Sequence, residues 1–261
     1  MTRPLGLVTG ASAGIGHAFA HGLAARGYDL VVVARDTARL EALRKELEAA
    51  HGTNVEVITA DLLQTVQVEA VEARLADGDR PIELLVNNAG FGTIGKFKDL
   101  PLDREVQEIE LNVIALTRLM HAALPNLLER RAGGVINVSS MASFQPTPGN
   151  ATYGATKAFV TSLSQGVHEE LRGTGVTVMA LCPGFTRTEF QQRAGVDSTE
   201  IPDFLWQEAR TVVDYAMKAF AKGKALCVPG PLNQATAGFS SVMPSTVTRR
   251  VAGLIVGRGD K

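Results

Sequence analysis

Near its start the chain reads Leu5-Gly6-Leu7-Val8-Thr9-Gly10-Ala11-Ser12-Ala13-Gly14-Ile15-Gly16. The apolar run predicts a buried strand over Leu5–Thr9, and apolar residues at helical spacing from Ile15 onward predict a helix. Glycines at the turn let the backbone bend sharply and approach a ligand. The start of the helix offers free N–H groups and a positive dipole end to phosphate. The segment therefore predicts a dinucleotide-binding turn, with contacts from Gly10, Ser12, Gly14, Ile15 and Gly16.

The same turn has a rival interpretation. Gly10-Ala11-Ser12-Ala13-Gly14 matches the G-x-S-x-G nucleophile elbow of hydrolases. That elbow needs an earlier strand and loop to supply its oxyanion donors, and only nine residues precede Gly10. Dinucleotide binding is therefore favoured, with a plain tight turn as the other alternative.

Strand patterns alternate with helix patterns along the rest of the chain. The expected strands are Leu5–Thr9, Leu30–Ala34, Val55–Thr59, Ile82–Val86, Val135–Val138, Val176–Leu181 and Ala225–Val228. The longer expected helices are Asp103–Arg131, with Pro125 kinking or ending it, and Tyr153–Leu171. This order predicts an α/β fold: a Rossmann-like, doubly wound parallel sheet of about seven strands, flanked by helices on both faces. We expect one domain over 1–261, with a substrate-loop region at about 189–212 and a C-terminal extension at about 230–261.

Composition narrows the function classes. The 261 residues carry 26 Lys and Arg against 27 Asp and Glu, a formal net charge of -1 that disfavours nucleic-acid binding. Two cysteines cannot form a disulfide framework or a four-ligand zinc site, and His17 and His21 have no third ligand near them in the sequence. No stretch of 18 apolar residues is present, and Val251–Val256 is too short for an anchor. We expect a cytoplasmic protein without a metal site or a stable membrane anchor.

The end of the second strand bears on the choice of dinucleotide. It reads Ala34-Arg35-Asp36, where an acid would accept hydrogen bonds from a ribose and an arginine would pair with a 2′-phosphate. We interpret Asp36 as the N-cap of a helix starting at Thr37, and Arg35 as the phosphate partner. NADP is therefore favoured, and NAD remains open.

Further motifs follow the later strands, and together they resemble the short-chain dehydrogenase/reductase family in its single-domain form. The resemblance covers about residues 4–230 and rests on Thr9-Gly10, Gly14-Ile15-Gly16, Asp61-Leu62, Asn87-Asn88-Ala89-Gly90, Asn112, Ser140, Tyr153-x-x-x-Lys157 and Pro183-Gly184. Tyr-x-x-x-Lys alone is a weak signal, but the ordered set at these element boundaries is specific.

The chemistry of Tyr153 and Lys157 can be argued from the residues. Reduction of a carbonyl needs a proton donor, and a free phenol with a pKa of about 10 is poorly matched to neutral pH. Lys157 lies four residues on, so its ammonium faces the same side of the helix. Two charges about 4 Å apart interact by roughly 4 kcal/mol, enough to lower the phenol pKa by about three units. The Ser140 hydroxyl could hold the substrate oxygen beside the phenol.

The resemblance implies the remaining roles. Ser140, rather than Ser139, takes the substrate-binding role, Asn112 holds a water that links Lys157 to solvent, and Lys157 also hydrogen-bonds the nicotinamide ribose. The implied cofactor contacts are Asp61 and Leu62 at the adenine, Asn88, Ala89 and Gly90 at the adenosine ribose, and Pro183, Gly184, Phe185 and Thr188 at the nicotinamide end, in addition to Tyr153 and Lys157.

Apolar residues gather at the expected sheet edge and in the irregular stretch that follows. We expect a hydrophobic cleft for a ketone, aldehyde or acyl chain, lined by Phe91, Phe144, Phe190 and Trp206 beside Ser140, with Ile201, Val242 and Met243 nearby. Ordinary core packing is the alternative.

These features together predict an NADP(H)-dependent oxidoreductase that interconverts a carbonyl and a secondary alcohol. The alternative is a non-catalytic dinucleotide-binding regulatory protein on the same fold, and the presence of both Tyr153 and Lys157 favours the enzyme. The resemblance also implies a homodimer or homotetramer, formed through the helices Asp103–Arg131 and Tyr153–Leu171.

Overall fold

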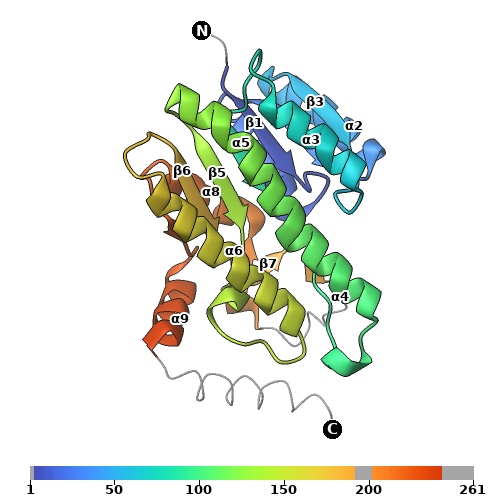
Figure 1. Ribbon diagram of the computed structural model, residues 1–261, viewed down its shortest axis with the longest axis vertical. Coiled ribbons are helices and arrows are strands. Elements are labelled where there is room, and N and C mark those ends of the chain that lie inside the picture. The colour runs from blue at the N-terminus through green and yellow to red at the C-terminus, as the bar shows by residue number, and fades with distance from the viewer. Residues whose placement is uncertain (1–2, 192–201, 243–261) are drawn as a thin grey trace.

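A computed structural model describes residues 3–191 and 202–242, and its central feature is a seven-stranded parallel sheet (Figure 1). The strands run in the order β3-β2-β1-β4-β5-β6-β9, with the chain order reversing between β1 and β4. Their bounds are β1 Leu5–Thr9, β2 Asp29–Ala34, β3 Val55–Thr59, β4 Leu84–Asn87, β5 Gly134–Val138, β6 Thr177–Leu181 and β9 Leu226–Cys227. The doubly wound fold expected from the sequence is confirmed, and such sheets bind ligands beyond the strands' carboxyl ends near that reversal.

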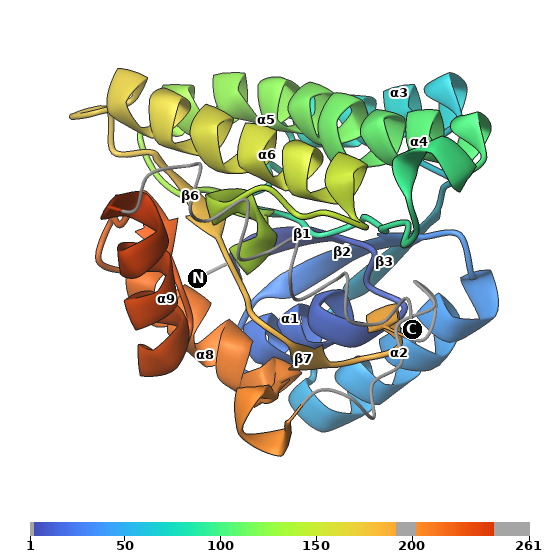
Figure 2. The same cartoon turned by 90° about the horizontal axis from the view of Figure 1, so that it is seen from below.

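Helices cover both faces of the sheet (Figure 2). One layer contains α1 (Gly14–Ala24), α2 (Thr37–His51) and α8 (Ala209–Phe220). The other contains α3 (Thr65–Ala76), α4 (Leu102–Ile109), α5 (Leu116–Arg130) and α6 (Ala151–Glu170).

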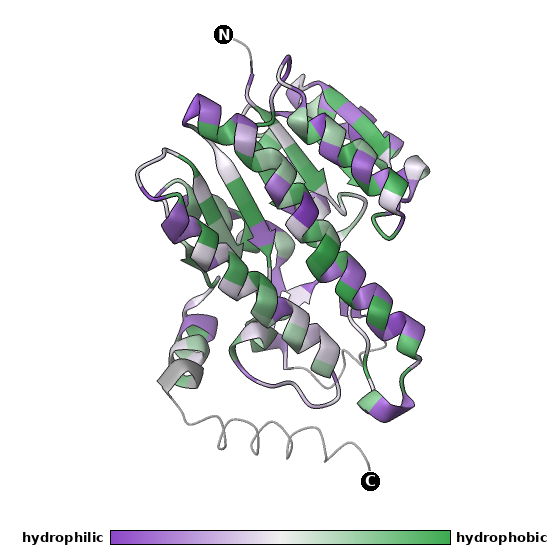
Figure 3. Cartoon of the chain, viewed as in Figure 1, coloured by the Kyte–Doolittle hydropathy of each residue, from purple (hydrophilic) through white to green (hydrophobic). Residues whose placement is uncertain are grey.

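Alternate strand residues supply two hydrophobic cores, one under each helical layer. Val8 and Val32 pack in the first core, whereas Leu7 and Val31 pack in the second. Because both faces are covered, the strands are almost continuously apolar, as the colouring in Figure 3 shows.

The long helix differs from the expectation. Pro125 lies inside α5, which continues to Arg130, so the prediction that the helix could end at Pro125 is wrong. The irregularity lies upstream, where a π-helical segment, η2 (Glu110–Ala115), joins α4 to α5. Over 102–130 this helix is long and apolar enough to cross a membrane by length and composition, and 44% of its apolar window is buried inside the protein.

The stretch before α8 carries little regular structure. Two short strands, β7 (Thr186–Arg187) and β8 (Gln207–Glu208), pair in parallel, and a 3-10 turn spans Asp203–Leu205. The expected apolar residues Ile201 and Met243, the side chain of Val242 and the segment Val251–Val256 lie outside the described residues. The C-terminal extension begins with α9 (Pro231–Val242), which packs against η3 (Met141–Phe144).

Two glycines of α6 have different environments, and substitutions at them test how α6 packs against the segment that contains Thr147. A Cβ added at Gly154 would lie 2.1 Å from Thr147 Oγ1, whereas one added at Gly166 would meet nothing within 4 Å. We expect Gly154→Ala to lower the free energy of unfolding by about 1–3 kcal/mol through overpacking. Gly166→Ala should raise it by about 0.5–1 kcal/mol through helix propensity. Chemical denaturation measures both, and equal effects would contradict this packing of α6.

Candidate active site

The glycine turn between β1 and α1 has a backbone that a ligand could approach closely. Gly10 and Gly14 have φ angles of 66° and 58°, in the left-handed region that favours glycine. A Cβ at Gly16 would lie 2.4 Å from the Gly10 carbonyl oxygen. Ala13 caps α1 without a side-chain hydrogen bond, so the first N–H groups of the helix remain available to an anion. Ser12 and Ile15 are partly buried in the same turn.

Residues at the end of β4 are hydrogen-bonded to Thr9 and to this turn. The Asn88 side-chain amide donates to the carbonyl oxygens of Thr9 (2.9 Å) and Gly10 (3.3 Å). The Thr9 hydroxyl oxygen accepts the backbone N–H groups of Asn88 (2.9 Å) and Ala89 (3.0 Å). The structure thus places Asn88 and Ala89 beside the glycine turn. The sequence interpretation did not assign the Thr9 side chain this role of positioning the end of β4. A hydroxyl at the end of a buried strand could have indicated it.

Tyr153, Ser140 and Lys157 come together at the end of β5. The Ser140 side chain lies close enough to the Tyr153 phenol to lower the phenol pKa, and it accepts the Ala142 N–H at 3.1 Å. Ser139 instead points into the core, where its hydroxyl donates to the Lys157 carbonyl oxygen at 2.8 Å. The geometry therefore distinguishes the two serines, with Ser140 on the side of the phenol.

The phenol pKa moves in the opposite direction to the sequence expectation. Burial raises the pKa of Tyr153 to about 12, and the nearby Ser140 side chain offsets this only in part. Lys157 Nζ donates to the Val138 carbonyl oxygen at 2.9 Å and lies over the Tyr153 ring, 5.5 Å from its centroid. Burial also lowers the pKa of Lys157 to about 8. The expected lowering of the Tyr153 pKa by Lys157 is therefore wrong for this arrangement, since burial of the phenol dominates.

Asn112 lies in the π-helical segment and is fully buried. Its amide nitrogen donates to the Phe91 carbonyl oxygen (2.8 Å) and to Thr156 Oγ1 (3.2 Å), and its Oδ1 accepts the Phe91 N–H at 3.1 Å. A Cβ at Gly90 would lie 2.8 Å from Asn112 Oδ1 and 3.5 Å from Lys157 Nζ. Gly90 thus leaves room for both side chains. π-Helical turns are frequent at functional sites.

The loop after β6 returns over the glycine turn. A Cβ at Gly14 would lie 3.2 Å from Thr188, so Thr188 covers the start of α1. Gly184, next to Pro183, packs closely on Asn233, because a Cβ there would lie 2.7 Å from that amide. Phe185 is 45% exposed, and its ring centroid lies 5.8 Å from that of Trp206.

The four expected substrate aromatics have different neighbours. The Phe190 ring lies 5.6 Å from the Tyr153 ring, centroid to centroid. The Phe91 ring lies under the Arg104 guanidinium at 4.5 Å, Trp206 pairs with Phe185, and Phe144 ends η3. Among these contacts, only the one with Phe190 reaches the Tyr153 side chain.

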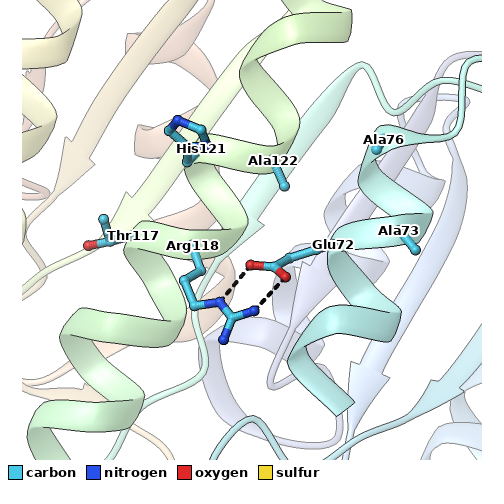
Figure 4. A pocket seen from close by; sticks show the side chains of 7 residues that line it. All are labelled: Glu72, Ala73, Ala76, Thr117, Arg118, His121 and Ala122. Atoms are coloured by element: carbon cyan, nitrogen blue, oxygen red, sulfur yellow. Dashed lines mark hydrogen bonds and ion pairs between the residues drawn. The ribbon is translucent and has the colours of Figure 1, made fainter. Parts of the chain in front are cut away.

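Two hollows lie away from Tyr153. A groove of about 560 Å³ runs between α3 and α5, where Arg118 forms a paired ion bridge with Glu72 at 2.7 Å, and it contains no expected site residue (Figure 4). A small cavity beside the ends of β1 and β4 is lined in part by Leu62 and Ala89. Leu62 follows Asp61, whose carboxylate accepts the Leu63 N–H at 3.1 Å.

The end of β2 agrees with the interpretation of Asp36. Its carboxylate accepts the Arg39 N–H at 3.0 Å and caps α2. Arg35 is exposed and forms no ion pair within the described part of the chain. Arg39, which the sequence interpretation did not single out, lies one helical turn after Arg35. Both oxygens of the Glu189 carboxylate accept hydrogen bonds from Arg39 Nη1 at 3.0 Å.

We expected no third metal ligand near His17 and His21, and the folded chain shows that this expectation is wrong. Glu46 from α2 approaches His21 Nε2 at 3.7 Å, and the donor atoms of the three residues lie within 4.8 Å of one another. This set could hold a metal ion. It lies on α1 and α2, in the layer on the far side of the sheet from α6 (Figure 2).

Comparisons with known proteins agree with this architecture. A family model described as short chain dehydrogenase matches residues 5–198. A short-chain dehydrogenase from Sphingobium yanoikuyae in complex with NADPH is 40% identical, with a TM-score of 0.83 over 92% of this chain and 96% of that one. The bulky-bulky ketone specific alcohol dehydrogenase from Comamonas testosteroni is 34% identical, with a TM-score of 0.79 over 94% and 96%. The sulfoacetaldehyde reductase of Chromohalobacter salexigens is 39% identical over 70% of this chain and 72% of its own length.

The buried lysine gives the free energy of unfolding a pH dependence. The pKa of Lys157 falls from 10.5 to about 8 on folding, so between these values the unfolded chain binds a proton that the folded protein has released. The stability of the wild type should therefore rise relative to Lys157→Met as the pH increases from about 8 to 10.5. Denaturant unfolding across this range measures the difference, with Lys45→Met as the control for losing one exposed lysine. A constant difference would contradict the buried, proton-releasing lysine.

Proposed function

Because the chain belongs to the short-chain dehydrogenase/reductase family, we propose that it is an NADP(H)-dependent oxidoreductase that interconverts a carbonyl and a secondary alcohol. One observation carries the proposal. The Tyr153 phenol lies near Ser140, and the buried Lys157 Nζ lies 5.5 Å from the centroid of its ring, at the sheet edge that also holds the glycine turn. A purely regulatory dinucleotide-binding protein has no need of this constellation.

The glycine turn fits a dinucleotide phosphate. The positive φ angles of Gly10 and Gly14 and the uncapped N–H groups of α1 form an anion-binding cradle. Around it, Asn88, Ala89, Gly90 and Thr188 would hold the ribose and phosphates, and Asp61 and Leu62 the adenine. Pro183, Gly184 and Phe185 would flank the nicotinamide, which supplies the hydride when the cofactor is bound. The NADPH complex of the Sphingobium neighbour and the exposed Arg35 support NADP as the cofactor.

Tyr153 is the proton donor in reduction. Its raised pKa keeps the phenol protonated at neutral pH, and Ser140 is placed to hold the substrate oxygen next to it. Lys157, with a pKa near 8, can give and regain a proton close to neutral pH. Asn112 fixes the backbone of Phe91 beside Lys157, and we assign its Oδ1 to a water that links the lysine to the outside.

The proposed substrate is a hydrophobic ketone or aldehyde. Phe190 packs against Tyr153, so an apolar group next to the reacting carbonyl would meet an aromatic wall. The bulky-ketone specificity of the Comamonas neighbour supports this choice. Phe91, Phe144 and Trp206 remain predicted substrate contacts, and a cytoplasmic location remains a prediction from the sequence.

We also propose a homodimer or homotetramer. Leu102, Ile109 and Ile114 on the long helix are 70%, 43% and 51% exposed, and Phe159 on α6 is 44% exposed. Apolar side chains exposed on two adjacent long helices are typical of an interface between copies of a chain.

Substitution of the phenol tests the reaction. Tyr153→Phe should lower kcat by about 10²–10⁴-fold, since it removes only the donated proton, and should leave NADPH affinity within about threefold. Turnover is followed by loss of the near-ultraviolet absorbance of NADPH over a panel of apolar, charged and sugar carbonyls, and affinity by calorimetry. Turnover confined to charged or sugar carbonyls would contradict the hydrophobic substrate, and a Tyr153→Phe enzyme of full activity would contradict the mechanism.

Substitution of the arginine tests the cofactor. Arg35→Ala should raise the Kd for NADPH by about 10- to 100-fold, because one charge-assisted contact with the 2′-phosphate contributes about 1.5–3 kcal/mol. The Kd for NADH should change little, since NADH lacks that phosphate. Lys45→Ala, which removes an exposed positive charge further along α2, is the matched control. Equal effects of Arg35→Ala on the two cofactors would reject the preference for NADP.

A further inference from the structure

Two buried carboxylates lie in α4 close to the candidate active site. Glu105 is 4% exposed and Glu108 is fully buried, one helical turn before Asn112. The Thr93 hydroxyl lies 2.5 Å from Glu105 Oε1 and 2.9 Å from Glu108 Oε2, and the Thr93 N–H donates to the latter oxygen at 3.0 Å. Thr152 at the start of α6 hydrogen-bonds the other oxygen of Glu105. Glu108 Oε1 has no hydrogen-bond partner among the described residues.

The contacts of this cluster are all satisfied as hydrogen bonds if one carboxyl is protonated. The Thr93 hydroxyl carries a single hydrogen, yet it contacts an oxygen of each carboxylate at hydrogen-bond distance. Both contacts are hydrogen bonds only if one carboxyl donates to Thr93 while Thr93 donates to the other. A neutral Glu108 also tolerates its unpartnered buried Oε1 far better than a carboxylate would.

The electrostatics assign the proton to Glu108. Burial raises the pKa of Glu108 to about 7, hydrogen bonds from Thr93 oppose the rise, and the charge of Glu105 adds to it. On the facing helix α6, the titratable groups whose charges reach Glu108 are Lys157 and Tyr153. Glu108 is therefore coupled to the two groups that the proposed reaction uses to deliver its proton.

Hydrogen bonds also connect Glu108 with the protein surface. Thr152 and Thr93 are partly exposed, and the chain Thr152–Glu105–Thr93–Glu108 alternates hydroxyl and carboxyl groups without a gap. Each hydroxyl can accept a proton on one side and release its own on the other. Such a chain can pass a proton from solvent to the buried carboxyl.

We propose that Glu108 is a proton store that recharges Lys157 after each reduction and is itself refilled along Thr152, Glu105 and Thr93. The inference rests on the proposed function and names the source of its proton. The Tyr153 O–H bond breaks as the proton joins the alkoxide oxygen, and Lys157 then protonates the phenolate. Glu108 next protonates the Lys157 amine through the water assigned to Asn112, and a proton from solvent restores the carboxyl. Only protons move in these steps.

The test variant is Glu108→Gln, which keeps the size and hydrogen-bonding capacity of the side chain but cannot exchange a proton. In the wild type, kcat for reduction should fall as the pH rises through about 7, which is the pKa of the Glu108 carboxyl. Above that pH Glu108 is deprotonated and has no proton to give. Glu108→Gln should lose that limb and about tenfold in kcat at pH 6, with an unchanged KM and a larger solvent deuterium isotope effect. Glu108→Asp should retain the limb with a shifted midpoint. Glu110→Gln, at an exposed position on the same long helix, is the matched control.

A readout independent of turnover follows the carboxyl itself. Carbon-13 NMR of the glutamate side chains in the cofactor-free protein should show one carboxyl titrating near pH 7 that is absent in Glu108→Gln. Because the charge of Glu108 raises the pKa of Lys157, nitrogen-15 NMR should show Lys157 titrating at lower pH in the variant.

The outcomes separate the two proposals. Turnover that depends on Tyr153 while Glu108→Gln keeps the wild-type pH limb and isotope effect would overturn the proton store alone. So would the absence of a glutamate carboxyl that titrates between about pH 6 and 8. A wild type that reduces no carbonyl would overturn the proposed function and the proton store with it.

Discussion

The site depends on the attachment of α6 to the end of β5, in which Lys157 makes two of the hydrogen bonds. Lys157 donates from its side chain to the Val138 carbonyl oxygen, and its own carbonyl oxygen accepts the Ser139 hydroxyl. These two bonds help to fix the position of α6 along β5 and its rotation about its own axis. Tyr153, one turn earlier, is thereby brought to Ser140, the next residue after Ser139. The burial that fixes this geometry also sets the pKa values of the phenol and the ammonium, so positioning and proton chemistry have one physical origin.

Much of this arrangement could be predicted because it is local or periodic in the sequence. Continuous apolar runs mark strands buried on both faces, and polar residues at or just after the ends of β1, β4 and β5 meet at one edge because the strands are parallel. The cap at Asp36 could also be predicted, since it needs only neighbouring residues. The direction of the Tyr153 pKa could not, because it depends on how completely other segments cover the ring. Phe190, 37 positions away in the sequence, packs on that ring.

Long-range contacts account for the other differences. Glu46 approaches His21 only because α1 and α2 pack side by side. Glu108 meets Thr93 because the chain after β4 folds back along α4, and a pattern of charges on a helix gives no hint of such an encounter. The π-helical turn around Asn112 has no marker comparable to a proline, and Pro125, which is a marker, lies within a continuing helix. In each case a partner distant in the sequence decides the outcome.

The ion pair between Arg39 and Glu189 joins the start of α2 to the segment that follows Thr188. Arg39 belongs to the helix that follows the Arg35 position, whereas Glu189 directly follows Thr188, which covers Gly14. Redesign of coenzyme selectivity at the start of α2 would therefore disturb the anchor of the segment leading toward Phe190 and Tyr153. Libraries that vary residues 35–39 are therefore best built with residue 189 varied alongside them.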